Sequence, residues 1–99
     1  MNVRIQSVHF SADSKLIDHV TRKLEKLTQF SDRIINVDVI LKIENLAHVV
    51  KDKVVEIKVH IPRCDFFTKT SSKTFEESFE DAYDSLVSQL KRKKDKLAA

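Results

Sequence analysis

The chain has 99 residues, 41% hydrophobic and 33% charged, with a formal net charge of +3 at pH 7. This length suits one domain with a single core, and no apolar run approaches the roughly 18 residues that a membrane span needs. The complete absence of Gly excludes the Gly-rich phosphate loops of many nucleotide-binding enzymes, where the backbone must approach phosphate closely.

The first third of the chain changes from a strand pattern to a helix pattern. Residues 2–8 alternate apolar and polar side chains, which is typical of a strand with one buried face. Over residues 15–28 the apolar side chains recur at helical spacing instead, and they form the stripe Leu16, Ile17, Val20, Leu24 and Leu27. Ser11, Asp13 or Ser14 could cap the start of this helix.

Three more strands and a second helix are predicted downstream. The strands are residues 37–44, 53–61 and the weaker 66–72. They are separated by turns over residues 45–52 and 62–65, and the longer turn has Asn45 and Asp52 in place of Gly. Helical spacing returns from Thr74 in the stripe Phe75, Phe79, Ala82, Tyr83, Leu86, Val87 and Leu90.

The predicted order of elements is β-α-β-β-β-α. Each strand has one apolar and one polar face, and two amphipathic helices are available to cover the apolar side. The first connection would be a right-handed crossover between parallel strands, and the next two would be antiparallel hairpins. The expected fold is α/β (α+β), a two-layer sandwich whose four-stranded sheet has both helices on one face, with residues 1–99 forming a single domain.

Positive charge is concentrated in two places. Residues 91–96 carry five basic side chains and one acidic, a net charge of +4, whereas residues 1–90 carry 13 basic and 14 acidic, a net charge of −1. We expect the second helix to continue past the sheet as a basic extension (about residues 91–97), because the helix dipole does not account for four consecutive basic residues. At about 100° per residue, one stripe of the first helix is also basic: Lys15, His19, Arg22 and Lys26, with Lys23 beside it.

A local basic surface favours a polyanionic partner, either nucleic acid or an anionic membrane. The alternatives are an ordinary solvated helix face and a solubilising tail. Phe66 or Phe67 could stack on a base, but one of them is expected in the core. Phosphate contacts would then dominate over stacking.

No pattern of catalytic or metal-binding residues is present. The histidines His9, His19, His48 and His60 lack metal-ligand spacing, and Cys64 has no evident catalytic partner. We therefore expect no enzyme, no metal and no cofactor. The single Cys and the alternating N-terminus, which lacks a signal-peptide pattern, favour a cytoplasmic location.

Two stretches, KLEKLTQFSDRIINVDVILKIEN and QLKRKKDKL, resemble the ribosome hibernation promoting factor and ribosome-associated inhibitor (sigma-54 modulation protein) family of bacteria, in its short form. The resemblance covers nearly the whole chain with nearly the same spacing. It implies the β-α-β-β-β-α fold with both helices on one sheet face. It also implies binding to the small ribosomal subunit in the mRNA and tRNA decoding channel, with inhibition of translation under stress or in stationary phase.

The resemblance also implies which residues bind ribosomal RNA. The family's basic positions match Lys23 and Lys26 in the first helix and Arg92, Lys93, Lys94 and Lys96 in the second, with Arg22 and Lys91 as more loosely matched neighbours. The chain departs from the family at Ser85 and Ser88, where Lys and Arg are frequent, and at Thr74 and Glu76, which replace the usual Asp and Tyr. The terminal cluster would then carry more of the binding.

The sequence thus predicts a non-enzymatic inhibitor of translation whose partner is 16S rRNA of the small subunit. We expect a monomer away from the ribosome, with no membrane and no small-molecule substrate. A general double-stranded-RNA-binding module and a protein-interaction module are the alternatives.

Overall fold

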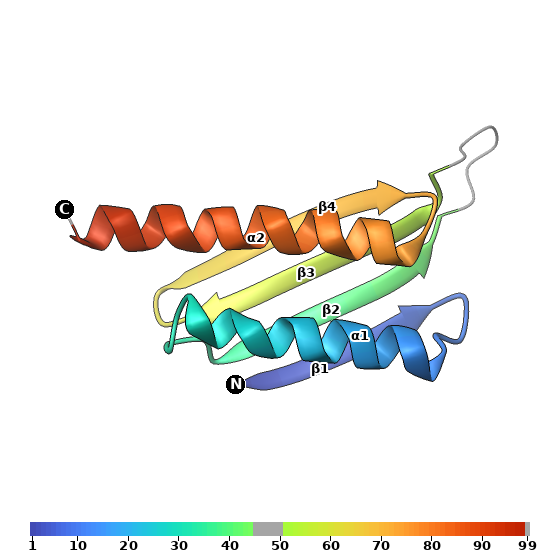
Figure 1. Cartoon of the computed structure of the whole chain (residues 1–99), viewed down its shortest axis with the longest axis horizontal. Helices are drawn as coiled ribbons and strands as arrows, with labels where there is room; N and C mark the ends of the chain where they lie inside the picture. The colour runs from blue at the N-terminus through green and yellow to red at the C-terminus, as the bar shows by residue number, and fades with distance from the viewer. Residues whose placement is uncertain (45–50, 99) are drawn as a thin grey trace.

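The computed structural model of the chain describes residues 1–44 and 51–98, with side chains up to Lys93. Its elements are β1 (Asn2–Val8), α1 (Ser14–Glu25), the 3₁₀ helix η1 (Lys26–Gln29), β2 (Asn36–Ile43), β3 (Lys53–Ile61), β4 (Cys64–Ser72) and α2 (Phe75–Ala98). The four strands form one sheet in the order β1-β2-β3-β4, and both helices cover the same face of it (Figure 1). The predicted two-layer β-α-β-β-β-α fold is confirmed.

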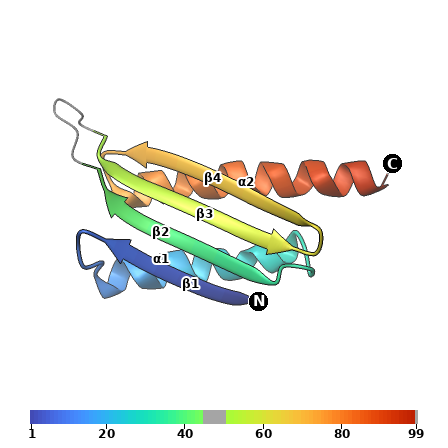
Figure 2. The same cartoon turned by 180° about the vertical axis from the view of Figure 1, so that it is seen from behind.

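The sheet is mixed, as predicted. β1 pairs with β2 in parallel, whereas β2–β3 and β3–β4 are antiparallel. From behind, no described helix crosses the strands, so the sheet has an outer face that the helices leave open (Figure 2). The predicted turn at 45–52 falls largely on residues outside those described; at its base the Glu44 N–H donates to the Asp52 carbonyl over 3.0 Å.

The second turn is shorter than the predicted 62–65, because β4 already begins at Cys64, opposite Ile61. Only Pro62 and Arg63 connect the two strands, and Arg63 has a φ of 68°. Pro at the first central position with a positive φ at the second is the pattern of a type II turn, which prefers Gly at the second position. In a chain without Gly, Arg63 adopts this conformation instead.

The first helix also ends earlier than predicted. The prediction ran a single helix to Thr28, but α1 ends at Glu25 and the next four residues form η1. The Lys26 N–H bonds to the Lys23 carbonyl three residues back, and bonds of this spacing tighten a helix into the 3₁₀ form. Among the three candidate caps, Asp13 caps α1: its carboxylate accepts from the Leu16 N–H at 2.8 Å.

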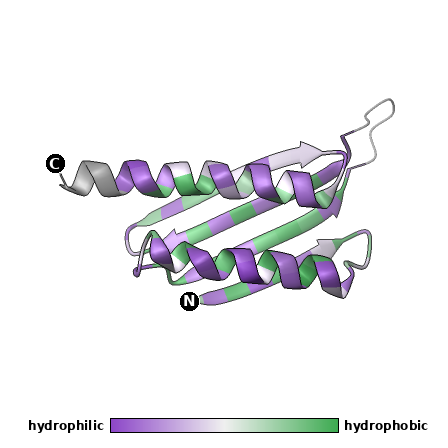
Figure 3. Cartoon of the chain, viewed as in Figure 1, coloured by the Kyte–Doolittle hydropathy of each residue, from purple (hydrophilic) through white to green (hydrophobic). Residues whose placement is uncertain are grey.

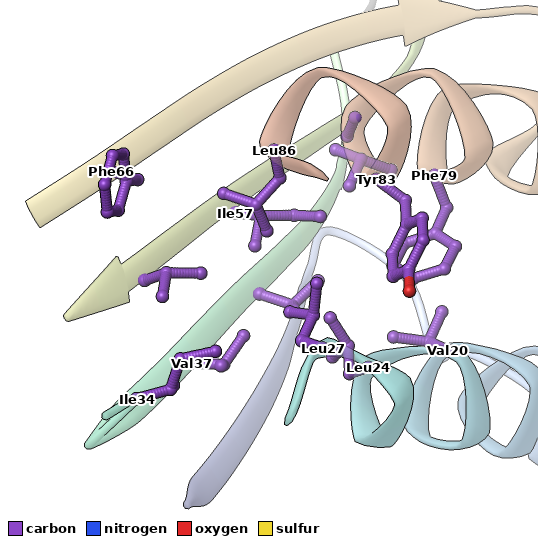
Figure 4. Packing of buried hydrophobic residues seen from close by; sticks show 14 of the residues in the cluster. Val20, Leu24, Leu27, Ile34, Val37, Ile57, Phe66, Phe79, Tyr83 and Leu86 are labelled. Carbon is purple, nitrogen blue, oxygen red and sulfur yellow. The ribbon is translucent and has the colours of Figure 1, made fainter. Parts of the chain in front are cut away.

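The core lies between the helices and the sheet. Both predicted apolar stripes are buried, except that Ile17 and Val87 are half-buried. Figure 4 shows Val20, Leu24 and Leu27 lying against side chains of α2 and the central strands. Hydrophilic residues occupy the outward sides of both helices (Figure 3). Val54 is an exception to the alternation of buried and exposed side chains along the strands, because it lies on the outer side of β3 and is nevertheless buried.

Polar contacts hold the start of α2 on the sheet. The fully buried Ser78 hydroxyl donates to the Lys53 carbonyl on β3 at 2.5 Å. The Ser78 carbonyl accepts from the Thr70 hydroxyl on β4 at 2.6 Å. The Thr74 hydroxyl caps the helix by accepting from the Glu77 N–H at 3.1 Å. These contacts lie in the first turns of α2, whereas its C-terminal end continues past the strands (Figure 1).

Candidate nucleic-acid interface

Basic side chains gather around the C-terminal end of α1. An open hollow on the helical face is lined by His19, Arg22, Lys23, Glu25, Lys26 and Gln29. Arg22 and Lys26 are exposed and Lys23 is half-buried. The three predicted residues of this region therefore share one surface, although Lys26 belongs to η1 rather than to α1.

Lys23 is already engaged within the protein. Its Nζ lies 3.1 Å from Glu80 Oε2 on α2 and 5.0 Å from the centroid of the Tyr83 ring. The other Glu80 oxygen lies 3.1 Å from His19 Nε2. The hydrogen bond to Glu80 is the main cause that raises the pKa of Lys23 above its usual value. Lys23 is thus firmly protonated, but a phosphate would have to compete with Glu80 for it.

The second group of basic residues begins where α2 leaves the core. Leu90 is buried, whereas Lys91 and Arg92 are exposed and Lys93 is half-buried. Lys91 Nζ lies 5.5 Å from the Phe30 ring centroid, directly after η1, and Arg92 Nε donates to the Ser88 carbonyl at 3.4 Å. Lys94 and Lys96 continue the same helix, which runs to Ala98.

The two basic groups lie at the same end of the molecule. α1 and α2 run in the same direction across the sheet, so both C-terminal ends point the same way (Figure 1). The contact between Lys91 and Phe30, the residue that follows η1, brings the start of the second group next to the segment that ends the first. Cations at helix C-termini are favoured by the helix dipole, which accounts for part of this arrangement.

The other end of the helical face is acidic. A second open hollow is lined by Glu76, Glu77, Glu80 and Asp81 of α2, together with His19 of α1. The acidic residues of the helical face therefore gather at one end and most of its basic residues at the other, although Lys15 lies at the acidic end (Figure 1). This distribution favours binding of a polyanion at one end only.

On the outer face of the sheet the charges mostly neutralise one another, as expected of a solvated surface. Lys42 Nζ lies 2.8 Å from Glu56 and 3.1 Å from Glu44. These two contacts are the main causes that raise the pKa of Lys42, and Lys42 is the main cause that lowers the pKa of Glu44. His60 also contacts the Asp65 carboxylate, the main cause that lowers the pKa of Asp65.

The structure separates the two neighbouring phenylalanines. Phe66 packs in the core at 8% exposure, whereas Phe67 is 54% exposed on the outer face. The sequence left both choices open. The alternation of β4 carries the missing signal, since Thr68 and Ser72 are buried on the same side as Phe66.

Other kinds of site find no support in the described part of the chain. Among residues 1–44 and 51–98, no group of three His, Cys, Asp or Glu side chains is placed to bind a metal ion. Over the same ranges, no helix combines the length and apolar character needed to cross a bilayer. The Cys64 thiol is half-buried, 3.8 Å from the Asp65 carbonyl.

Comparisons with known proteins agree with this fold. Residues 3–98 match the family described as sigma 54 modulation protein / S30EA ribosomal protein. A ribosome hibernation promoting factor of Pseudomonas putida is 30% identical over 96 residues, which are 97% of this chain and 89% of that protein.

Two solved structures are also similar. The N-terminal domain of Protein Y from Thermus thermophilus superimposes with a TM-score of 0.77 at 25% identity, covering 93% of this chain and 98% of that one. A ribosomal subunit interface protein of Coxiella burnetii superimposes with a TM-score of 0.85 at 20% identity, over 96% of this chain and 99% of that one. At that identity the second likeness shows the fold alone.

The relative from Pseudomonas putida is a ribosome hibernation factor, which is not an enzyme, and this confirms the predicted non-enzymatic class. The family match covers almost the whole chain, including both helices and all four strands. The chain belongs to the sigma 54 modulation protein / S30EA ribosomal protein family of ribosome hibernation factors.

Proposed function

We propose that this protein binds the small ribosomal subunit through 16S rRNA, at the channel where mRNA and tRNA anticodons lie, and inhibits translation under stress or in stationary phase. The observation that carries the proposal is the gathering of two basic groups at one end of the helical face. The cellular site would be the cytoplasm, where ribosomes work, and the protein would be a monomer when it is not bound.

The proposed mechanism is steric. The molecule is elongated, with principal extents of 46 × 26 × 19 Å, so it can occupy a groove lengthwise. The basic end would hold phosphates of the channel wall, and the body of the sandwich would fill space that mRNA and tRNA need. No covalent chemistry is required.

Phosphate anchoring predicts a steep dependence on salt. If Arg22, Lys26 and three residues of the basic extension neutralise about five phosphates, the slope of log affinity against log salt should be about −4. Cosedimentation with purified small subunits at a series of salt concentrations measures this slope. A flat dependence would contradict the electrostatic part of the proposal.

Competition tests the location. A tRNA anticodon stem-loop with a short mRNA should be displaced from small subunits as the protein is added, because both would need the same space. Simultaneous binding of the protein and the anticodon stem-loop would show that the protein binds elsewhere.

Binding to a free RNA duplex should be measured alongside binding to small subunits. If free duplexes bind as tightly as intact subunits, the protein is a general double-stranded-RNA binder and the ribosomal proposal is wrong. We expect much weaker binding to duplexes, because the proposed contacts need the shape of the channel as well as its charge.

A further inference from the structure

Almost every aromatic side chain in this protein has an evident structural partner. Four rings pair with other rings: Phe10 with Phe75 at 4.6 Å between centroids, and Phe79 with Tyr83 at 6.1 Å. Phe30 lies under Lys91, and Phe66 is in the core. Phe67 differs from all of these: it is 54% exposed and has no aromatic or cationic partner among residues 1–44 and 51–93.

Two lysines surround Phe67 on the outer face of the sheet. Lys58 lies directly opposite on β3, and Lys69 is two residues along the same strand, so both side chains share the face of Phe67. Their side chains are 56% and 48% exposed. Their ion pairs, 3.7 Å to Asp65 and 3.5 Å to Glu44, are longer than the ion pairs of Lys42 on the same face. Exposed pairs of this kind contribute little free energy, so the lysines can turn to other anions.

Phe67 also lies close to the basic end of the helical face. β4 is an edge strand of the sheet, and the Gln89 side chain donates to the Phe67 carbonyl at 3.3 Å. Gln89 comes two residues before Lys91, where the basic extension begins. An RNA strand held by Lys91 and Arg92 would therefore pass the edge of β4 beside Phe67.

We propose that Phe67 is a stacking platform for an unpaired RNA base, with Lys58 and Lys69 holding the phosphates on either side of it. The site rests on the proposed function, and it extends the RNA contact from the helical face around the edge of β4 to the outer face of the sheet. Aromatic stacking is tolerant of base identity, since every base has a π-face. The expected ligand is therefore single-stranded RNA without a fixed sequence.

The first test compares three substitutions in binding to purified small subunits. Phe67→Ala and Phe67→Leu should weaken binding roughly tenfold or more, whereas Phe67→Tyr should bind like the original protein because it retains the ring. Ser71→Ala, an exposed change on the same face, is the matched control and should have no effect. If Phe67→Leu binds like the original protein, the contact is apolar packing and the stacking proposal is wrong.

The second test uses the absence of Trp from the chain. Phe67→Trp introduces one fluorescent reporter at the proposed site, and Ser71→Trp introduces one on the same face four residues away. A base stacked on the indole should quench the first reporter and leave the second unchanged. Quenching is expected with small subunits.

Each outcome has a distinct meaning. If subunits bind but quench neither reporter, or quench both reporters equally, no base stacks at position 67 and the stacking proposal is wrong. If the original protein binds subunits and Phe67→Ala binds equally well, only the stacking site is wrong. If the original protein does not bind subunits at all, the proposed function fails and the stacking site fails with it. Thermal unfolding of each variant verifies folding, which an exposed position should preserve.

Discussion

At Lys23 the ammonium group has two neighbours, the Glu80 carboxylate at 3.1 Å and the Tyr83 ring at 5.0 Å. The helical wheel of α1 places Lys23 beside the basic stripe, and this could be predicted from local spacing. Its partner Glu80 lies 57 positions later in the chain, so no local pattern could show that the charge is partly compensated. Phe67 is a different case, because the alternation of β4 places it on the side of the exposed Asp65 and Lys69, so a local pattern does indicate which of the two adjacent phenylalanines is exposed.

Replacing Glu80 should strengthen RNA binding. In Glu80→Gln the carboxylate that competes with phosphate for Lys23 is removed. We expect affinity for small subunits to rise about threefold to tenfold at low salt, the range for one additional charge-assisted phosphate contact. Asp81→Asn is the matched control, since it makes the same change of net charge at the next, exposed position. Equal strengthening by both variants would show that only net charge matters.

The turn residue Arg63 offers a test of local strain. Its φ of 68° costs a residue with a Cβ about 1 kcal/mol, so Arg63→Gly should raise the free energy of unfolding by up to about that amount. The greater flexibility of Gly in the unfolded chain offsets part of the gain. Urea unfolding measures the difference. A lower stability of the variant would show that the Arg63 side chain makes a contact that stabilises the fold by more than the backbone strain costs.

At the level of elements, the strands and helices follow directly from apolar spacing. The early end of α1 and the short turn between β3 and β4 do not, because hydrogen bonds of one or two residues decide them. Both lie at element boundaries, where the apolar pattern has already ended and single backbone bonds determine the course of the chain. The hydrogen bonds of the buried Ser78 could not be predicted from apolar spacing either, because Ser is a common residue on exposed surfaces.

Ser78 should matter for stability. Ser78→Ala removes the donor to the partly buried Lys53 carbonyl, and leaving such an acceptor unpaired costs about 1 kcal/mol, the lower end of the range for fully buried groups. The free energy of unfolding should fall by that amount in urea. The exposed Ser71→Ala serves as the control and should be neutral. An unchanged stability of Ser78→Ala would mean that another donor reaches the carbonyl.

Two substitutions at Asp95 test whether RNA binding depends on the helical form of the basic extension as well as on its charge. Asp95→Pro and Asp95→Ala change the net charge equally, but Pro disrupts the last turns of α2 at a cost of about 3 kcal/mol to the helix. If the helix positions the lysines, Asp95→Pro should bind small subunits several-fold more weakly than Asp95→Ala. Circular dichroism verifies the loss of helix. Equal binding would mean that the extension works as a flexible charged tail.

At the scale of the whole molecule, the separation of acidic and basic residues towards opposite ends of the helical face should make position more important than net charge. Lys93→Glu/Lys94→Glu should lose most binding to small subunits and reduce the salt slope by about two, because two phosphate contacts are removed. The matched control is Lys51→Glu/Lys73→Glu, which makes the same charge change at exposed positions near the acidic end. Equal losses in both variants would contradict a localised interface.

The separation of core and binding residues along α2 has a consequence for how such a protein can change. Its core residues lie between Phe75 and Leu90, and its proposed binding residues in this helix begin at Lys91. Insertions or substitutions after Leu90 can therefore alter the affinity for RNA while the core keeps its stability. Selection on binding strength and selection on folding then act on separate parts of a single helix, and the charge of the extension is free to adapt to the salt conditions inside different cells.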